Sequence, residues 1–374
     1  MPETTTRRLA ARWIGTTPIR VWGVPTTERL RRSLVHAGIW DAGDWSGAVP
    51  KGATGVLLFL GDHVYDDALV RALARSPGAV VARDDGLAAC AHAVPDDAGR
   101  VAAMLASRHP GIRARAPEEI VPAHAVALRR RADPFVLEVN GSSRRAVEDR
   151  LFAASYKGVT DAVTKYLWPA PARAVCRACV RAGLTPNAVT LASLGLAAAA
   201  FLLFWDGRLA AGLACAWATT FLDTVDGKLA RVTLTSSRLG DALDHGLDLI
   251  HPPFWWWAWW MGAGGVDPGA ITVVVAGYVL LRMQEGLFLK LFGMELHVWR
   301  PFDSRFRLIT ARRNPILVIL TAALLLGDPA EGLRAAAAWT LASLGVHAIR
   351  ILQALRVRQE KGLLASWLDR SPSR

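Results

Sequence analysis

Long apolar stretches separated by short polar segments fill the second half of the chain. They cover about residues 188–205, 209–229, 240–261, 269–291, 312–328 and 333–355. A helix that crosses the hydrocarbon core of a bilayer needs about 20 mostly apolar residues. Most of the stretches are close to that length, and the fifth is the shortest. The pattern predicts a membrane domain of six transmembrane helices.

The first part of the chain instead shows short apolar runs, typical of strands, that alternate with amphipathic segments, typical of helices. Strands are expected at residues 19–24, 55–60, 79–82 and 135–139. After the first of these, Thr26 or Thr27 is the expected N-cap of a helix that ends near Gly38. Strands that alternate with helices favour a mostly parallel sheet. Residues 1–142 are therefore expected to form a cytosolic α/β domain fused to the membrane domain.

Two further segments complete the predicted organisation. Residues 143–183 are rich in basic and aromatic side chains, which suits a helix lying on the membrane surface. An ordinary solvated linker helix would have the same composition. Residues 359–374 are polar and are expected to form a flexible tail. The membrane domain then covers residues 184–358.

The charge of the chain narrows the possible partners. The formal net charge is +12, the pI is about 10.3 and the mean hydropathy is +0.25. Such a positive excess is compatible with nucleic acid, an anionic membrane surface or anionic substrates. The apolar second half favours the last two, so no nucleic-acid partner is expected. The four cysteines are too scattered for a disulfide framework.

The loops between the apolar stretches predict the orientation in the membrane. Loops after the first, third and fifth stretches carry almost no Lys or Arg, whereas those after the second and fourth are basic. Basic loops remain in the cytosol. The first twenty residues contain four arginines and no apolar core, so no cleavable signal peptide is expected. Both termini are therefore expected on the cytosolic side of the cell (inner) membrane.

A group of five tryptophans lies near the other end of the third apolar stretch. They occupy positions 255, 256, 257, 259 and 260. Tryptophan is enriched where a membrane helix meets the water interface. This group is therefore expected to form an interfacial anchor on the non-cytosolic side.

Four aspartates flank the basic loop between the second and third stretches. Asp223 and Asp226 are three residues apart, and Asp244 and Asp248 are four apart. On helices, each pair projects from one face. Charged groups in membrane helices are costly unless they pair or bind cations, so they indicate function. If the two faces meet, the four aspartates form a four-carboxylate cup.

The chemistry of this cup favours a divalent cation. Carboxylates a few ångströms apart raise each other's pKa, and a bound cation relieves that conflict. Oxygen-only ligation suits Mg²⁺ or Mn²⁺ better than Zn²⁺. Gly227, Ala230 and Gly240 leave the helix surfaces bare, and Arg231 offers a fork of donors to phosphate oxygens. The segment is thus suited to metal-assisted chemistry on a pyrophosphate.

The pattern Asp223-x2-Asp226-Gly227-x2-Ala230-Arg231-x8-Gly240-x3-Asp244-x3-Asp248 resembles the signature of the CDP-alcohol phosphotransferase family without a departure. The resemblance implies a six-helix membrane domain, usually a homodimer. Such a domain moves a substituted phosphate from a CDP-linked alcohol to a hydroxyl acceptor and releases CMP.

The resemblance also implies roles for individual residues. The metal ligands would be Asp223, Asp226 and Asp244, with Asp248 as a further ligand or as the base that takes the acceptor proton. The CDP site would be lined by Gly227, Ala230, Arg231 and Gly240. The sequence TPN-x-x-T, which begins at Thr185, is also similar to the family, and Asn187 would help to bind the diphosphate.

The acceptor site is expected between residues 282 and 314. Arg312 and Arg313 open the fifth stretch on the side of the cup, where they would suit a phosphorylated acceptor. Positive-inside topology explains these arginines equally well. The similarity of the first domain, described next, favours inositol phosphate or another polyol.

The strand at 55–60 followed by Gly61-Asp62-His63 resembles the metal-binding corner of sugar-phosphate nucleotidyltransferases, a fold found ahead of some family members. Such enzymes carry a glycine-rich basic loop after their first strand. Here Gly23-Val24-Pro25-Thr26-Thr27 stands in its place, so a degenerate, non-catalytic domain is expected. The alternative is a bifunctional enzyme whose first domain is an active cytidylyltransferase.

A function of another class is a cation transporter that uses the same acids as its ion path. That hypothesis predicts acids spread across the depth of the bilayer. Here they cluster at one face with glycine and arginine between them. The pattern therefore favours the transferase.

Overall fold

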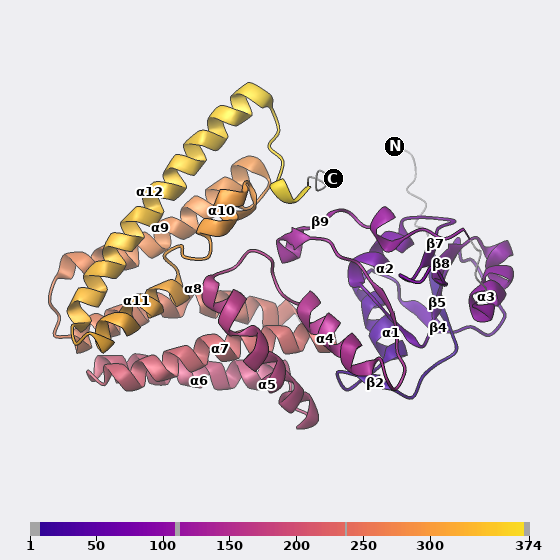
Figure 1. The fold of residues 1–374 in the computed structure, drawn as a ribbon, viewed down its shortest axis with the longest axis horizontal. Coiled ribbons are helices and arrows are strands. Elements are labelled where there is room, and N and C mark those ends of the chain that lie inside the picture. Colours follow the sequence, from indigo (N-terminus) through magenta and orange to yellow (C-terminus); the bar gives the residue numbers. More distant parts are fainter. Residues whose placement is uncertain (1–7, 109–112, 236–237, 370–374) are drawn as a thin grey trace. The chain divides into compact units, whose positions relative to one another are not determined.

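The computed structural model describes residues 8–108, 113–235 and 238–369, with only the backbone described in 238–249. By their contacts the residues form two compact units, both traced in Figure 1. The first unit contains Met1–Val126, Arg131–Tyr156 and Val232–Leu234. The second, here called the helical unit, contains Ala127–Arg130, Lys157–Arg231 and Thr235–Arg374. An α/β unit and a helical unit agree with the predicted fold class.

A five-stranded sheet in the order β4-β1-β5-β8-β7 forms the centre of the first unit. Its strands are β1 (Leu9–Ile14), β4 (Asp41–Asp44), β5 (Gly55–Leu60), β7 (Val80–Ala82) and β8 (Ala88–Ala93). β1 pairs in parallel with β4 and β5, whereas β8 pairs antiparallel with β5 and β7. The prediction of a mostly parallel sheet is therefore wrong, because the sheet contains both parallel and antiparallel strand pairs. Every residue of β5 and β8 is buried.

The expected first strand at 19–24 is also wrong. This run forms a tight hairpin of β2 (Arg20–Val21) and β3 (Val24–Pro25), with positive φ at Trp22 and Gly23. Positive φ at both central residues matches the twist of a two-residue hairpin. Trp22 is buried, and its indole Nε1 donates to the Glu148 carbonyl at 2.9 Å. The first strand is instead β1. The charged Arg12, which pairs with Asp41, interrupts its apolar run and hid the strand from the sequence pattern.

The remaining elements of the first unit lie around this sheet. They are α1 (Thr26–His36), β6 (His63–Tyr65), α2 (Asp67–Ala74), α3 (Ala98–Ser107), β11 (Val136–Glu138) and α4 (Arg144–Ala154). The N-cap of α1 is Pro25, and the Thr26 hydroxyl instead donates to the Gly61 carbonyl. β11 pairs with β6 outside the main sheet. Since α4 belongs to the first unit, the segment 143–183 is divided between the units after Tyr156.

The helical unit consists mainly of long helices. They are α5 (Pro169–Arg181), α6 (Pro186–Trp205), α7 (Leu209–Thr233), α8 (Arg238–Gly262), α9 (Pro268–Phe292), α10 (Pro301–Phe306), α11 (Arg313–Leu325) and α12 (Pro329–Lys361). Before these helices in the sequence come two short strands, β9 (His124–Ala125), which belongs to the first unit, and β10 (Arg130–Arg131). Among the described residues, α6, α9 and α12 are long and apolar enough to cross a membrane, and α11 is a shorter apolar helix. These three helices are candidate membrane spans, half of the six that the sequence predicts.

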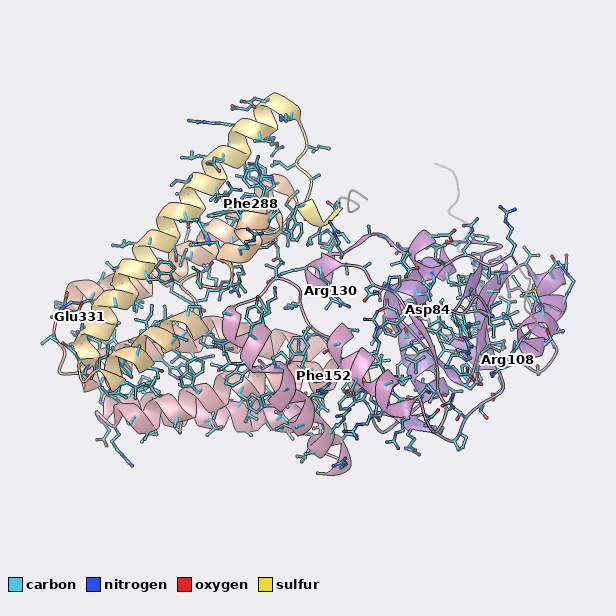
Figure 2. The ribbon with its side chains drawn as sticks, in the orientation of Figure 1. Asp84, Arg108, Arg130, Phe152, Phe288 and Glu331 are labelled. Atoms are coloured by element: carbon cyan, nitrogen blue, oxygen red, sulfur yellow. The ribbon has the colours of Figure 1, made fainter. Side chains whose placement is uncertain are left out.

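The pair α9 and α12 runs side by side in the helical unit (Figure 1). Gly277 of α9 faces Thr340 of α12 so closely that a Cβ on Gly277 would lie 2.3 Å from the threonine methyl. Small residues allow such close approach of membrane helices. Near the end of this pair, Phe288 is fully buried with Leu296, Trp299, Ile351 and Ala354 (Figure 2).

The prediction of a flexible tail is wrong for residues 366–368. Ser366 and Leu368 are buried, and the indole of Trp367 donates to the Ser304 hydroxyl at 3.0 Å. The Ser366 hydroxyl donates to the Val298 carbonyl at 2.5 Å. The apolar Trp367-Leu368 pair explains this docking, because burying it against the chain removes apolar surface from water.

The tryptophan group is only partly exposed. Trp255, Trp256 and Trp259 of α8 are fully buried, and the Trp255 indole donates to the Ala197 carbonyl at 2.9 Å. Trp257, on another face, is 48% exposed. The prediction that the tryptophans anchor this helix at the membrane interface is therefore wrong for Trp255, Trp256 and Trp259, because these three side chains face neighbouring helices.

We expect Gly61→Ala to destabilise the first unit by about 1–3 kcal/mol, since overpacking against backbone has that cost. The new Cβ would lie 1.9 Å from the Gly15 carbonyl oxygen, at the point where the Gly61 amide donates to the Ile14 carbonyl. Hydrogen exchange of β1 and β5 peptides in the full-length protein measures the effect. Gly99→Ala is the matched control, because Gly99 lies in α3 with nothing within 4 Å. Equal protection in both variants would contradict the expectation.

Candidate functional site: an aspartate pair held by α6 and α11

Asp223 and Asp226 lie one turn apart on α7 and are each contacted from another helix. Arg313, the first residue of α11, donates through its terminal nitrogen to Asp223 Oδ2 at 2.5 Å. The Thr190 hydroxyl of α6 donates to Asp226 Oδ2 at 2.6 Å. Asp226 is buried, at 5% exposure. Three helices therefore position the two carboxylates.

The start of α6 explains why Thr190 reaches this site. Thr185 is the N-cap and accepts from the Ala188 amide, and Pro186 fills the first helical position. Asn187 is exposed in the first turn, whereas Thr190 lies one turn further on and faces α7. The sequence TPN-x-x-T thus brings its last residue to the aspartates. A role for Asn187 stays a prediction.

Arg231 lies over the bare surface of Gly227. A Cβ on Gly227 would be 3.7 Å and 3.9 Å from the two terminal nitrogens of the Arg231 guanidinium. Arg231 is otherwise exposed, and Ala230 is partly buried. A flat cationic group beside the aspartates is suited to anionic oxygens.

The second half of the predicted cup lies outside the described side chains. Gly240, Asp244 and Asp248 fall in the part of α8 whose backbone alone is described. The next described polar side chain of α8 is His251, whose Nε2 lies 3.4 Å from an Arg313 nitrogen. Its ring also contacts Trp255, with centroids 4.4 Å apart. No feature of the sequence around His251 indicated this contact.

Arg312 and Arg313 are adjacent in sequence but contact different carboxylates. Arg312 donates to Glu285 of α9, through Nε to Oε1 at 3.2 Å and through a terminal nitrogen to Oε2. Arg282 lies 3.5 Å from the same carboxylate. Arg313 turns instead to Asp223. Of the two predicted acceptor residues, only Arg313 contacts the aspartate pair.

The described part of the site fits a hard divalent cation. Its donors are the carboxylates of Asp223 and Asp226 and the hydroxyl of Thr190, all of them oxygen. Mg²⁺ and Mn²⁺ prefer oxygen ligands of this kind. The ion pair between Arg313 and Asp223 already places a positive charge beside this carboxylate.

The corner at Asp62 in the first unit forms an ion-pair network. Asp62 shares a hydrogen bond of 2.7 Å with His63 and is paired with Arg108, which also contacts Glu138 at 2.9 Å (Arg108 is labelled in Figure 2). Arg83 pairs with Glu138 as well. Burial alone would raise the pKa of Asp62, but His63 and Arg108 outweigh it and lower the pKa to about 2. The carboxylate of Asp62, in the corner that resembles a metal site, is thus compensated by Arg108 and His63.

Residues 183–346 match the family model of CDP-alcohol phosphatidyltransferase. The chain contains a CDP-alcohol phosphatidyltransferase domain. This agrees with the resemblance of the aspartate motif, all of which lies within the matched range.

Curated relatives of this phosphatidyltransferase domain are named phosphatidylinositol phosphate synthase. The protein from Mycobacterium marinum is 34% identical over 119 residues, which are 31% of this chain and 50% of the relative. The protein from Mycobacterium bovis is 35% identical over 94 residues, or 23% and 43% of the two chains. The chain therefore spans about half the length of the curated relatives it matches.

Solved structures similar to the chain include the phosphatidylinositol phosphate synthase of Mycobacterium tuberculosis. Its complex with manganese and citrate has a TM-score of 0.37 and 21% identity, over 48% of this chain and 87% of that one. Its CDP-DAG-bound form has a TM-score of 0.36 and 21% identity, over 49% and 90%.

We expect the Asp62 network to make the first unit sensitive to acid. The folded pKa of Asp62, about 2, lies below the ordinary 3.8, so its contribution is present above pH 3.8 and is lost as the pH falls towards 2. Asp62→Asn should cost on the order of 2 kcal/mol at pH 7 and reduce this acid sensitivity. Hydrogen exchange of β5 and β6 at pH 6 and pH 3 measures both effects.

The matched control is Asp41→Asn, since the Arg12–Asp41 pair has an aspartate that is 48% exposed. Such a pair contributes about 1 kcal/mol or less. An Asp62 variant that behaves like the Asp41 variant would show that the network does not stabilise the fold.

Proposed function

We propose that residues 184–358 form an integral-membrane transferase that moves a substituted phosphate from a CDP-linked alcohol, such as CDP-diacylglycerol, to a hydroxyl acceptor and releases CMP. The observation that carries the proposal is the complete aspartate motif inside a matched phosphatidyltransferase domain. The positioning of Asp223 and Asp226 by α11 and α6 supports it.

Within this proposal, Asp223, Asp226, Asp244 and Asp248 hold Mg²⁺ or Mn²⁺. The ion, when bound, neutralises charge on the pyrophosphate. Thr190 orients the Asp226 carboxylate by donating to its Oδ2. Asn187, Gly227, Ala230, Arg231 and Gly240 line the CDP site, where Arg231 contributes positive charge over the Gly227 surface.

Asp248 orients the acceptor hydroxyl and takes its proton. The acceptor oxygen then forms a bond to the phosphorus next to the donor alcohol, and the bond from that phosphorus to CMP breaks. Positions 244, 248 and 251 follow the i, i+4, i+7 spacing of one helix face, and α8 is helical throughout 238–262. Since His251 approaches Arg313, which pairs with Asp223, this spacing supports a cup shared by α7 and α8.

The membrane arrangement is part of the proposal. The six spans are α6, α7, α8, α9, α11 and α12, of which α7, α8 and α9 each have 25 residues. At 1.5 Å per residue these three are about 37 Å long, enough for a hydrocarbon core of about 30 Å. The loop charges favour termini and cup on the cytosolic side of the inner membrane. A homodimer is expected from the family resemblance.

The acceptor proposed is inositol phosphate or another polyol. The matched relatives are named phosphatidylinositol phosphate synthase. Arg313 beside the aspartates and Arg312 beside Glu285 are the proposed acceptor-binding residues. A phosphorylated polyol would suit their guanidinium groups.

Two other functions find less support. An active cytidylyltransferase in the first unit would need a metal corner, but Asp62 is engaged by His63 and Arg108. After β1 the chain reads Gly15-Thr16-Thr17-Pro18, with no basic glycine-rich loop. CTP binding that is lost on Asp62→Asn in the full-length protein would favour that function. A cation transporter is not favoured by the family match.

The main test is CMP release from CDP-diacylglycerol in the presence of a panel of alcohols and polyol phosphates. We expect Asp226→Asn and Asp248→Ala to lower the rate by at least about 10²-fold, the usual scale for losing a catalytic acid or base. Asp206→Asn is the control, since Asp206 is an exposed residue at the end of α6. No CMP release by the wild-type protein with any acceptor, or full activity of both variants, would exclude the proposal.

A second test separates the acceptor site from the donor site. We expect Arg312→Met to raise the KM for a phosphorylated acceptor about 10-fold or more, with little change in the KM for the CDP donor, because Arg312 contacts Glu285 rather than Asp223 or Asp226. The control is Arg334→Met, since Arg334 is exposed and pairs with Glu331. Parallel increases in both KM values would argue against acceptor binding by Arg312.

A further inference from the structure

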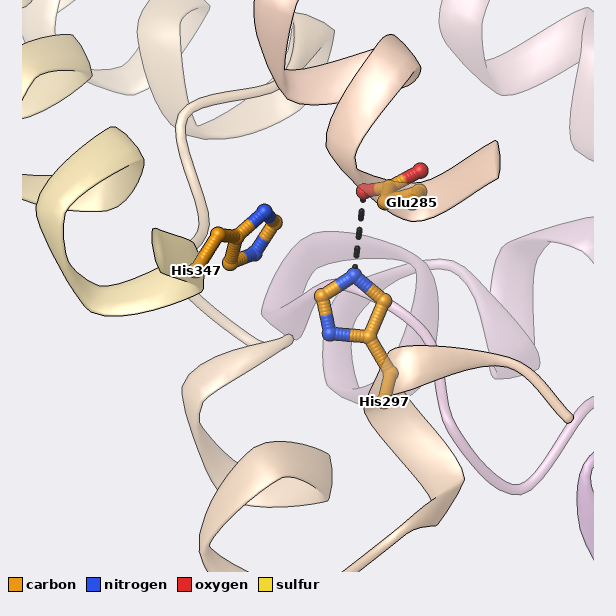
Figure 3. Close-up of side chains that lie close together, drawn as sticks. All are labelled: Glu285, His297 and His347. Carbon is orange, nitrogen blue, oxygen red and sulfur yellow. Dashed lines mark hydrogen bonds and ion pairs between the residues drawn. The ribbon is translucent and has the colours of Figure 1, made fainter. Parts of the chain in front are cut away.

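Glu285, His297 and His347 meet inside the helical unit (Figure 3). Glu285 comes from α9, His347 from α12, and His297 from the turn at Leu296–Val298 that follows α9. One ligand-capable atom from each lies within 4.8 Å of the other two. Glu285 Oε1 and His297 Nε2 are already 3.1 Å apart. Three different segments thus bring these side chains to one point.

The two histidines are buried without a full set of partners. His297 and His347 are 2% and 0% exposed. Among the described residues, neither ring nitrogen of His347 has a hydrogen-bond partner, and Nδ1 of His297 has none. A buried polar group without a partner costs about 1–3 kcal/mol. In Figure 3 the His347 ring lies beside both Glu285 and His297, so a bound ion there would satisfy it.

The side-chain types at this point are common metal ligands. Imidazole nitrogens and carboxylate oxygens both coordinate transition metals in proteins. Arg312 donates to both oxygens of Glu285, and Oε1 also lies 3.1 Å from His297 Nε2.

We propose that Glu285, His297 and His347 bind Zn²⁺. Two imidazoles and one carboxylate form a donor set that suits Zn²⁺ better than Mg²⁺. These ligands differ from the oxygen-only set on α7, so the site is additional to the proposed catalytic metal site.

The geometry needs only a small adjustment to accept this ion. Ligands about 2.05 Å from a tetrahedral Zn²⁺ are about 3.3 Å from one another. The 3.1 Å between Glu285 Oε1 and His297 Nε2 already matches this spacing. The ligand nitrogen of His347, which lies within 4.8 Å of the other two ligand atoms, has to move closer to them. Arg282, Arg307 and Arg312 add positive charge around the cluster. The fourth ligand is therefore an anion, such as hydroxide or a phosphate oxygen.

The test uses full-length, tag-free protein in detergent, stripped with a chelator and then titrated with Zn²⁺ alone or Co²⁺ alone. To remove the oxygen-only site, both the reference protein and its variants carry Asp226→Asn. We expect about one equivalent of zinc by mass spectrometry. Co²⁺ should give the intense visible absorption typical of tetrahedral coordination. His347→Ala and Glu285→Gln should each weaken zinc binding at least 10-fold and abolish the cobalt spectrum.

The controls separate ligation from folding and from the proposed transferase function. His251→Ala changes the histidine beside Arg313 and should leave the zinc stoichiometry and the cobalt spectrum unchanged. If His347→Ala does not fold, His347→Gln and His297→Gln provide the same comparison. Undiminished zinc affinity in the ligand variants, or no zinc bound by the reference protein, would overturn the proposal. Neither readout depends on CMP release, so this proposal and the transferase can fail separately.

Discussion

The cost of placing charge inside a helical membrane domain is the constraint on which the rest of this structure depends. Among its described residues, three carboxylates have a cation or hydroxyl beside them: Arg313 at the half-buried Asp223, Thr190 at the buried Asp226 and Arg312 at the half-buried Glu285. Asp303, 1% exposed, is held by Arg350 in a two-point pair of 2.6 Å and 2.9 Å. Because a buried charge that loses its partner is strongly destabilising, these pairs also determine how the helices pack.

Two adjacent arginines at the start of α11 contact carboxylates on two different helices. Arg312 donates to Glu285 of α9, and Arg313 donates to Asp223 of α7. The proposed donor site and the Glu285 cluster are therefore linked through one short piece of backbone. A change of ligand at either carboxylate would alter the electrostatics at the other, since the interior screens charge weakly.

The first unit also pairs a carboxylate with cationic side chains, at the corner formed by Asp62. Its Asp62 corner is closed by Arg108 and His63, and Gly61 packs directly against the Gly15 carbonyl. A compact corner with its charges compensated stabilises a fold and leaves fewer open ligand positions. The expected loss of catalysis in this unit stays a prediction.

The sequence alone determined the aspartate motif, the phosphatidyltransferase family and the helical nature of the second half, because fixed spacing and apolar length are local properties. It also indicated the α/β unit, although β1 and the mixed strand order escaped it, since pairing partners are distant in sequence. Only the tertiary structure decided that Thr190 rather than Asn187 meets Asp226, that Arg312 and Arg313 diverge, and that Glu285, His297 and His347 converge. These contacts depend on how helices pack in three dimensions, and residue spacing within one helix carries no information about that packing.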